Sequence, residues 1–166
     1  MNPAYMTLDG EVLDVTRLSP VEKEHFERCY AIFASRGDWK KLTELVRGAD
    51  NPLIGPGRRV SRDVAAHPLY RAVRDLEDRL GILTGNLAPD PGDEPGTDPL
   101  DDSLVSIAEA AGMKGTTVMA VRKAISRGDL VATTSRPQRV SSRSLAQWSV
   151  NVVRQRARAG RNLVTA

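Results

Sequence analysis

Two short helices joined by a tight turn are indicated in the C-terminal half of the chain, and this pattern constrains the fold most. Ser106 and Glu109 have the spacing of a capping box, in which the hydroxyl and the carboxylate each accept a hydrogen bond from a backbone amide. Gly115 allows the left-handed backbone of a turn, and Thr117 can cap a second helix that ends at Gly128. The sequence therefore predicts a helix-turn-helix.

The second helix has one apolar side and one cationic side when its residues are placed at intervals of about 100°. The side expected to face inward carries Val121, Ala124 and Ile125. The opposite side carries Met119, Arg122, Lys123 and Ser126. A solvated surface is the ordinary interpretation of such a helix taken alone, but the segments that follow it favour a functional one.

Residues 130–140 predict two short β segments around a turn near Arg136 and Pro137, because proline presets a turn dihedral and cannot donate to a β ladder. This hairpin would form a basic wing. Ser141 or Ser142 can then cap a third helix, whose apolar residues recur at helical spacing and would pack beneath the other two. Those apolar residues are Leu145, Trp148 and Val152.

This order of elements resembles the excisionase-type winged helix-turn-helix, which is related to the DNA-binding head of MerR-like regulators. The similarity covers residues 103–150. It rests on Ser-Ile-Ala-Glu-Ala-Ala from residue 106, the turn glycine, Val-Arg-Lys-Ala-Ile from residue 121, Arg-Gly-Asp-Leu from residue 127 and the run from Arg139 to Trp148. Thr116 and Val118 depart from the family pattern, which has an apolar residue at the first position and a polar one at the second.

The resemblance implies that the second helix enters the major groove of DNA and that the wing meets the DNA backbone or minor groove. Double-stranded DNA is the partner that this arrangement implies. The positions expected to contact DNA are Thr116, Thr117, Met119, Arg122, Lys123, Ser126 and Arg127 of the helix, and Arg136, Gln138 and Arg139 of the wing.

The distribution of charge favours a nucleic-acid partner independently. Residues 103–166 carry eleven cations and two anions, a balance of +9, whereas residues 1–102 carry thirteen cations and nineteen anions, a balance of −6. A basic half gains affinity for a polyanion through counterion release. The alternative is that the last arginines only keep the protein in solution, namely Arg154, Arg156, Arg158 and Arg161.

Residues 88–102 contain four prolines, two glycines, six acids and no basic residue. Such a segment buries little apolar surface and repels itself, so it predicts a disordered linker between two domains. A second hypothesis is that its acids fold back onto the basic half and compete with DNA, although acidic spacers ordinarily act only as spacers.

Residues 1–87 predict a small helical domain. The Asp-Gly dipeptide within residues 8–15 is a hairpin signal. Ser19 and Glu22 begin a helix that extends to Ser35, and Asp38 caps a second one. The residues of the first helix expected to face inward are Val21, Phe26, Cys29, Tyr30 and Phe33.

A third helical segment, which Ser61 opens, carries a leucine-rich stripe at heptad spacing: Leu69, Val73, Leu76 and Leu80. The stripe could be an association surface, because helix-turn-helix proteins commonly bind DNA as dimers. An intramolecular core is the favoured alternative, since four positions span fewer than two heptads. The opposite side is expected to face solvent, with the charge pairs Arg71–Asp75, Arg74–Asp78 and Asp75–Arg79.

Several function classes are excluded at this stage. A single cysteine, no long apolar run and no signal segment favour a cytoplasmic, nucleoid-associated protein. His25 and Cys29 lie four residues apart, but a zinc site needs further ligands, so no metal and no other cofactor is expected. The loop at residues 55–57 lacks the Lys-Ser/Thr ending of a phosphate-binding loop. Because no nucleophile, base and orienting group can be placed together, no enzymatic reaction is assigned.

These observations predict a mainly α fold. It comprises an acidic helical association domain (residues 1–87), a disordered linker (residues 88–102), a winged helix-turn-helix with a short β-hairpin wing (residues 103–160) and a tail (residues 161–166). The expected function is sequence-specific binding of double-stranded DNA in the regulation of transcription, with the N-terminal domain binding a second copy or another protein. An excisionase-like architectural factor in site-specific recombination, and an adaptor that holds an acidic protein without binding DNA, are the alternatives.

Overall fold

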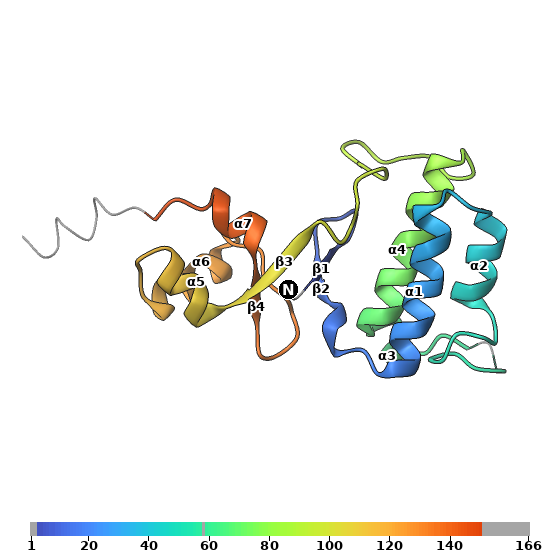
Figure 1. Ribbon diagram of the computed structural model, residues 1–166, viewed down its shortest axis with the longest axis horizontal. Coiled ribbons are helices and arrows are strands. Elements are labelled where there is room, and N and C mark those ends of the chain that lie inside the picture. Colours follow the sequence, from blue (N-terminus) through green and yellow to red (C-terminus); the bar gives the residue numbers. More distant parts are fainter. Residues whose placement is uncertain (1–2, 58, 151–166) are drawn as a thin grey trace, which may run out of the picture.

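Both halves of the chain contribute strands to one antiparallel sheet. The computed structural model describes residues 3–57 and 59–150, and within them the strand order is β2-β1-β3-β4. The strands are β1 (Pro3–Met6), β2 (Val12–Asp14), β3 (Asp102–Ser106) and β4 (Arg139–Ser141). Figure 1 shows this sheet between a larger group of helices from the N-terminal part and a smaller group from the C-terminal part.

Six of the seven α-helices in the described residues begin at side-chain caps that the sequence predicts, and the remaining one begins at His67, a cap that was not predicted. The N-terminal part forms the 3-10 turn η1 (Val15–Arg17) and the helices α1 (Pro20–Ala34), α2 (Trp39–Arg47), α3 (Arg62–Ala66) and α4 (Pro68–Leu83). The C-terminal part forms α5 (Ile107–Met113), α6 (Val118–Arg127) and α7 (Ser142–Gln147). Ser19 and Glu22 make both hydrogen bonds of a capping box at α1, as do Ser106 and Glu109 at α5, so both predicted capping boxes are confirmed.

The prediction of a mainly α protein with two domains and a disordered acidic linker is wrong. The sheet crosses between the halves, because β1 pairs with β3 and places Ala4 opposite Asp102. Just before β3, the Met6 amide donates to the Pro99 carbonyl at 2.8 Å, so residues 88–102 are bonded to the N-terminal part. The described residues form one compact domain of seven helices and a curled four-stranded sheet, not a helical domain tethered to a separate winged helix-turn-helix.

The side chain of Arg79 on α4 holds residues 88–102, the acidic segment, in place. Its guanidinium donates to the carbonyl oxygens of Glu94 at 3.3 Å, Thr97 at 3.1 Å and Met6 at 2.9 Å. Its Nε donates to Asp75 at 2.6 Å. Prolines remove backbone donors, so the carbonyls of this segment depend on donors from elsewhere, and a guanidinium with five N–H groups supplies them from one side chain.

The carboxylate of Asp75 balances this buried cation and connects it to the N-terminal hairpin. It accepts hydrogen bonds from the Tyr5 hydroxyl and from the Leu8 amide, both at 2.7 Å. Burial, followed by the neighbouring Asp75 carboxylate, raises the pKa of Tyr5 well above its ordinary value, so the phenol remains a donor. Asp75 and Arg79 are only 8% and 3% exposed, so the prediction that this side of α4 faces solvent is wrong.

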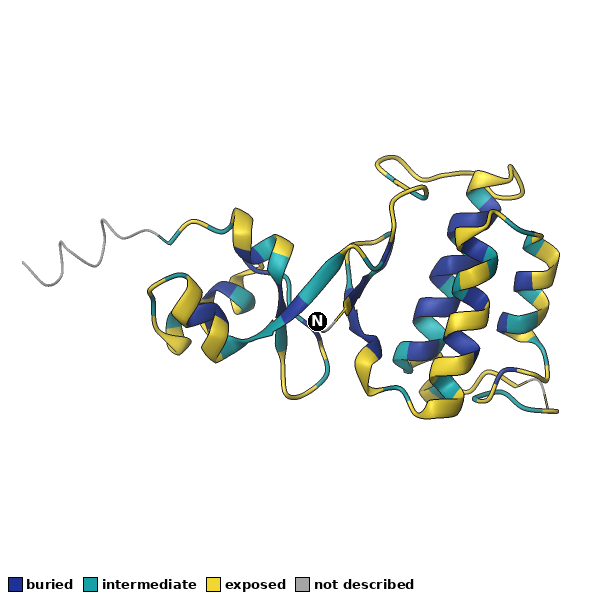
Figure 2. Ribbon diagram, viewed as in Figure 1, coloured by how far each residue is buried: buried dark blue, intermediate teal, exposed yellow. Residues whose placement is uncertain are grey.

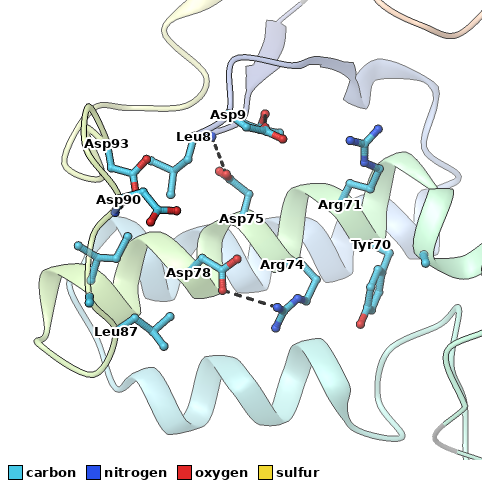
Figure 3. Close-up of a pocket in the computed structure, with 14 residues that line it drawn as sticks. Leu8, Asp9, Tyr70, Arg71, Arg74, Asp75, Asp78, Leu87, Asp90 and Asp93 are labelled. Carbon is cyan, nitrogen blue, oxygen red and sulfur yellow. Dashed lines mark hydrogen bonds and ion pairs between the residues drawn. The ribbon is translucent and has the colours of Figure 1, made fainter.

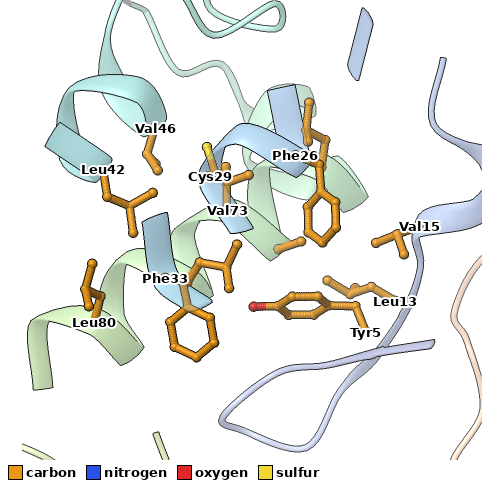
Figure 4. Packing of buried hydrophobic residues seen from close by; sticks show 13 residues of the cluster. Tyr5, Leu13, Val15, Phe26, Cys29, Phe33, Leu42, Val46, Val73 and Leu80 are labelled. Carbon is orange, nitrogen blue, oxygen red and sulfur yellow. The ribbon is translucent and has the colours of Figure 1, made fainter. Parts of the chain in front are cut away.

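The larger hydrophobic core lies between the N-terminal hairpin and the helices α1, α2 and α4. Figure 4 shows Tyr5 and Leu13 of the hairpin facing Phe26 of α1, and the Tyr5 and Phe26 rings meet edge to face with centroids 5.9 Å apart. Val21, which was expected to face inward, is 63% exposed because it lies in the first turn of α1, away from this cluster.

The leucine-rich stripe of α4 is part of this core. Its four residues are all 0% exposed, namely Leu69, Val73, Leu76 and Leu80. In Figure 2 the buried residues follow the sides along which α1 and α4 face each other. The stripe therefore packs inside the chain and is not presented as an association surface.

The smaller core lies between the β3–β4 pair and the helices α5 to α7. Val121 is 0% exposed and Leu145 is 1% exposed, whereas Trp148 is only half-buried and α7 ends before it. Leu145 is therefore the main anchor of α7. The rest of the predicted third helix with Val152, the remainder of the proposed domain to residue 160 and the tail at residues 161–166 lie outside the described residues, as do Arg154, Arg156, Arg158 and Arg161.

Replacing Arg79 with Ala is expected to lower the free energy of unfolding by roughly 3–5 kcal/mol, because Asp75 would remain buried without its cation. Urea denaturation measures this change, and hydrogen exchange at residues 88–102 measures the release of the segment. Lys41→Ala on the exposed side of α2 is the control, with an expected change below about 0.5 kcal/mol. Unaltered exchange in the Arg79 variant would contradict the proposed role of this side chain.

Candidate nucleic-acid interface

Helix α6 is anchored on one side and presents the other to solvent. Its cap is Thr117, whose hydroxyl accepts from the Ala120 amide at 3.1 Å, and its end is Gly128, whose φ is +79°. Val121 and Ala124 are buried against the smaller core. The exposed side carries Met119, Arg122, Lys123, Ser126 and Arg127, as the helical spacing predicts.

The segment after α6 folds back as a hairpin-like turn. The Thr133 amide donates to the Arg139 carbonyl at 2.8 Å, and the Ser141 amide donates to the Val131 carbonyl at 3.0 Å. Only β4 is a regular strand here, because Ala132 forms an isolated bridge and not the predicted second strand. The turn residues are exposed, namely Arg136, Pro137 and Gln138.

A groove of about 820 Å³ separates α6 from this turn. Arg122 and Ser126 lie on its helical side, and Arg136 and Gln138 lie on its turn side. The lining also includes Ser106, Ile107, Ile125 and Pro137, and it contains two guanidinium groups but no carboxylate. An anionic group fits such a groove because it would meet cations from two elements and no opposing charge.

Most of the cations at this surface have no acidic partner among the residues that the structure describes. Within residues 3–57 and 59–150, no ion pair involves Arg122, Lys123, Arg127 or Arg136. Arg139 differs, because it is half-buried and its charge acts on Glu109. The hydrogen bonds from Ser106, with a smaller contribution from Arg139, lower the pKa of Glu109.

The predicted contact residues thus fall into three groups. Four line the groove, namely Arg122, Ser126, Arg136 and Gln138. Four others are exposed outside it, namely Thr117, Met119, Lys123 and Arg127. Thr116 and Arg139 are half-buried. The Thr116 hydroxyl is buried without a hydrogen-bond partner among the described residues.

The sequence gives no indication that Arg17 belongs to this surface. Arg17 Nη1 donates to the Arg136 carbonyl at 2.6 Å, so the end of η1 supports the turn that carries Arg136. The same guanidinium lies 3.5 Å from Asp14, whose side chain is 1% exposed. Since Arg17 and Arg136 are 119 residues apart, no local pattern could have predicted this contact.

In the described part of the chain, the acidic segment contacts the C-terminal part at the start of α7 and not at the cations of α6. Asp101 pairs with Arg143 at 2.8 Å, and Asp102 accepts from the Arg143 amide at 3.1 Å and from Ser141 Oγ at 2.5 Å. These contacts lie at the start of α7. Among the residues that the structure describes, no acid of this segment pairs with Arg122 or another cation of α6.

The two residues considered as metal ligands are both buried. Cys29 Sγ lies 3.7 Å from His25 Nε2, and the side chains belong to residues that are 0% and 3% exposed. Burial raises the pKa of the Cys29 thiol to about 12, which keeps it protonated. No group of three or more metal-ligating side chains lies together among the described residues.

A second cavity, of about 510 Å³, lies between the N-terminal hairpin, α4 and the acidic segment. Figure 3 shows Arg74 directed toward Asp78 and the Leu8 amide directed toward Asp75. Arg71 is paired with Glu11. Both guanidiniums of this cavity are therefore paired within the chain, and its five lining carboxylates outnumber them. Its charge is opposite to that of the groove beside α6.

The chain was compared with protein-family models, with curated proteins and with solved structures, and none of the three comparisons gave a match. Among the described residues, no helix has the length and apolar character needed to span a bilayer.

Replacing Arg17 with Ala is expected to loosen the turn at residues 135–138, because the Arg136 carbonyl would lose its donor. Backbone order parameters from NMR relaxation would fall at Ser135, Arg136 and Gln138. Arg143→Ala removes an exposed cation at α7 and should leave these values unchanged. Equal order parameters in the Arg17 variant and the native protein would show that η1 does not support the turn.

The folded protein is expected to lose stability as the pH falls below about 6.5. Burial, together with Arg28, lowers the pKa of His25 from its ordinary value of 6.5, whereas Asp50 acts in the opposite direction. The unfolded chain therefore binds a proton at higher pH than the native protein does, and acid favours unfolding. Urea denaturation between pH 7.5 and about 5.5 measures the slope, which should be smaller in His25→Gln; identical slopes would contradict this assignment.

Proposed function

We propose that this protein binds double-stranded DNA in a sequence-specific manner and regulates transcription. The observation that carries the proposal is the groove beside α6, where Arg122 and Arg136 come from two elements and no carboxylate of residues 3–57 or 59–150 lines the groove. In this proposal α5 and α6 act as a helix-turn-helix, α6 enters the major groove, and the turn at residues 136–138 acts as the wing. Such a protein would reside in the cytoplasm with the nucleoid.

The spacing of anchors and cations supports this orientation of α6. Val121 and Ala124 fix the inner side of the helix, so Arg122 and Lys123 project away from the core together. Arginine and lysine at the start and middle of such a helix can donate to the O6 and N7 atoms of guanine or to phosphate oxygens. The resemblance of residues 103–150 to excisionase-type DNA-binding domains points to the same side of α6.

The charge of the C-terminal part supports a polyanionic partner. Residues 103–150 carry seven cations and two anions, a balance of +5, while residues 1–102 have a balance of −6. The acidic part would be repelled from DNA and the basic part attracted, so a duplex would approach from the side of α6.

Replacing Arg122 or Lys123 with Ala is expected to weaken binding to a selected duplex by about 1–3 kcal/mol where the side chain contacts a base. A phosphate contact would instead reduce the slope of log K against log salt by about one and affect all sequences similarly. Gel shifts over a salt series, with duplexes selected from a random pool, measure both quantities. Lys41→Ala removes the same charge on α2, in the group of helices on the other side of the sheet, and is the matched control.

The same experiment separates the alternatives. Several cooperative shifts together with bending of the duplex would favour an architectural role in recombination over recruitment or exclusion of polymerase. An absence of retention at low salt would overturn DNA binding and favour an adaptor for an acidic protein. Full affinity in an Arg122→Ala, Lys123→Ala double variant would contradict the placement of α6 in the groove.

A further inference from the structure

The beginning of α6 exposes apolar side chains that nothing in the described part of the chain covers. Val118 and Met119, the first two residues of the helix, are 39% and 59% exposed. Met113, at the end of α5, is 67% exposed. Val118 and Met119 are adjacent in the sequence, and neighbouring exposed apolar groups mark binding surfaces more often than isolated ones do.

These side chains lie next to the cations of α6. Residues three and four apart on a helix are neighbours, so Met119 borders Arg122 and Lys123, and Val118 borders Arg122. A partner that covers Met119 therefore also meets two cations that have no acidic partner in the described part of the chain. An apolar protein surface would have to desolvate these charges, whereas a polyanion would neutralise them.

The position of Val118 and Met119 at the start of α6 indicates which part of a DNA duplex they would contact. In helix-turn-helix proteins the N-terminal residues of the recognition helix contact base edges in the major groove. The edges of the bases there carry hydrogen-bond donors and acceptors, and the C5-methyl group of thymine is the apolar group among them. Methionine is unbranched and polarizable, so it can adapt its shape to a methyl group on either strand.

We propose that Met119, with Val118 beside it, recognises thymine through the C5-methyl group in the major groove, and so determines part of the DNA sequence preference. The inference rests on the proposed function, because it assigns a base contact to the same helix. It predicts that sites bound by this protein contain at least one thymine whose methyl group contributes to affinity and is sensed by residue 119.

The experiment replaces each thymine of a selected duplex, one at a time, with deoxyuridine, which removes only the methyl group. At the contacted thymine the affinity of the native protein should fall about fourfold, the factor that corresponds to exposing one methyl-sized apolar group. Met119→Ala should bind the thymine duplex about fourfold more weakly than the native protein and should not distinguish thymine from deoxyuridine. Met119→Leu keeps an apolar side chain and should retain the distinction.

Two control variants show whether the effect belongs to Met119. Arg122→Ala should lower the affinity for both duplexes and keep the ratio between them. Val21→Ala truncates a side chain that is similarly exposed on α1 and should change neither affinity nor ratio. Thermal unfolding of each variant checks that the fold is retained.

The outcomes separate this inference from DNA binding itself. Tight, selective binding that is equal for thymine and deoxyuridine at every position would overturn the role of Met119 and leave the proposed function standing. An absence of binding to every duplex would overturn both. Light scattering of the DNA-free protein adds a further check, because a dimer that Met119→Ala converts to a monomer would assign the apolar residues to self-association instead.

Discussion

A guanidinium that is removed from water needs both a counter-charge and acceptors for its N–H groups, and Arg79 obtains them from three separate segments of the chain. Asp75 supplies the charge, Met6 supplies an acceptor from β1, and Glu94 and Thr97 supply acceptors from the acidic segment. Any one of these partners alone would leave some N–H groups of the guanidinium without an acceptor. A single side chain thus contacts all three segments, and the hydrogen bond from the Met6 amide to the Pro99 carbonyl and the pairing of β1 with β3 continue this connection into β3.

The pairing of β3 with both β1 and β4 also determines the geometry of the candidate interface. Because β3 pairs with β1 on one side and β4 on the other, the turn that follows α6 is fixed relative to the N-terminal hairpin. Arg17 adds a contact from η1 to the carbonyl of Arg136. The groove between α6 and the turn is thus supported from both ends of the sheet, although its charged side chains all come from the C-terminal part.

Local features of the fold could be predicted from the sequence, because a few neighbouring residues determine them. The capping box at Ser106 and the left-handed stop at Gly128 each depend on three or four residues, and the apolar spacing of α6 identified its exposed side. Long-range pairings could not be predicted. The composition of residues 88–102 indicates disorder, whereas long-range contacts with Arg79, Met6 and Arg143 hold this segment in place. Likewise, no residue near Arg136 in the sequence indicates its contact with Arg17.

The shared sheet has a consequence for dividing the chain into fragments. A fragment that starts at residue 103 would keep α5, α6 and the turn, but it would lose β1, the neighbour of β3. Ser103 would lose its pairing with Pro3, so the start of β3 would lie at an open sheet edge, which favours pairing between molecules and aggregation. Low solubility of an isolated half would consequently reflect the strand edge that the division exposes and not the solubility of the intact protein.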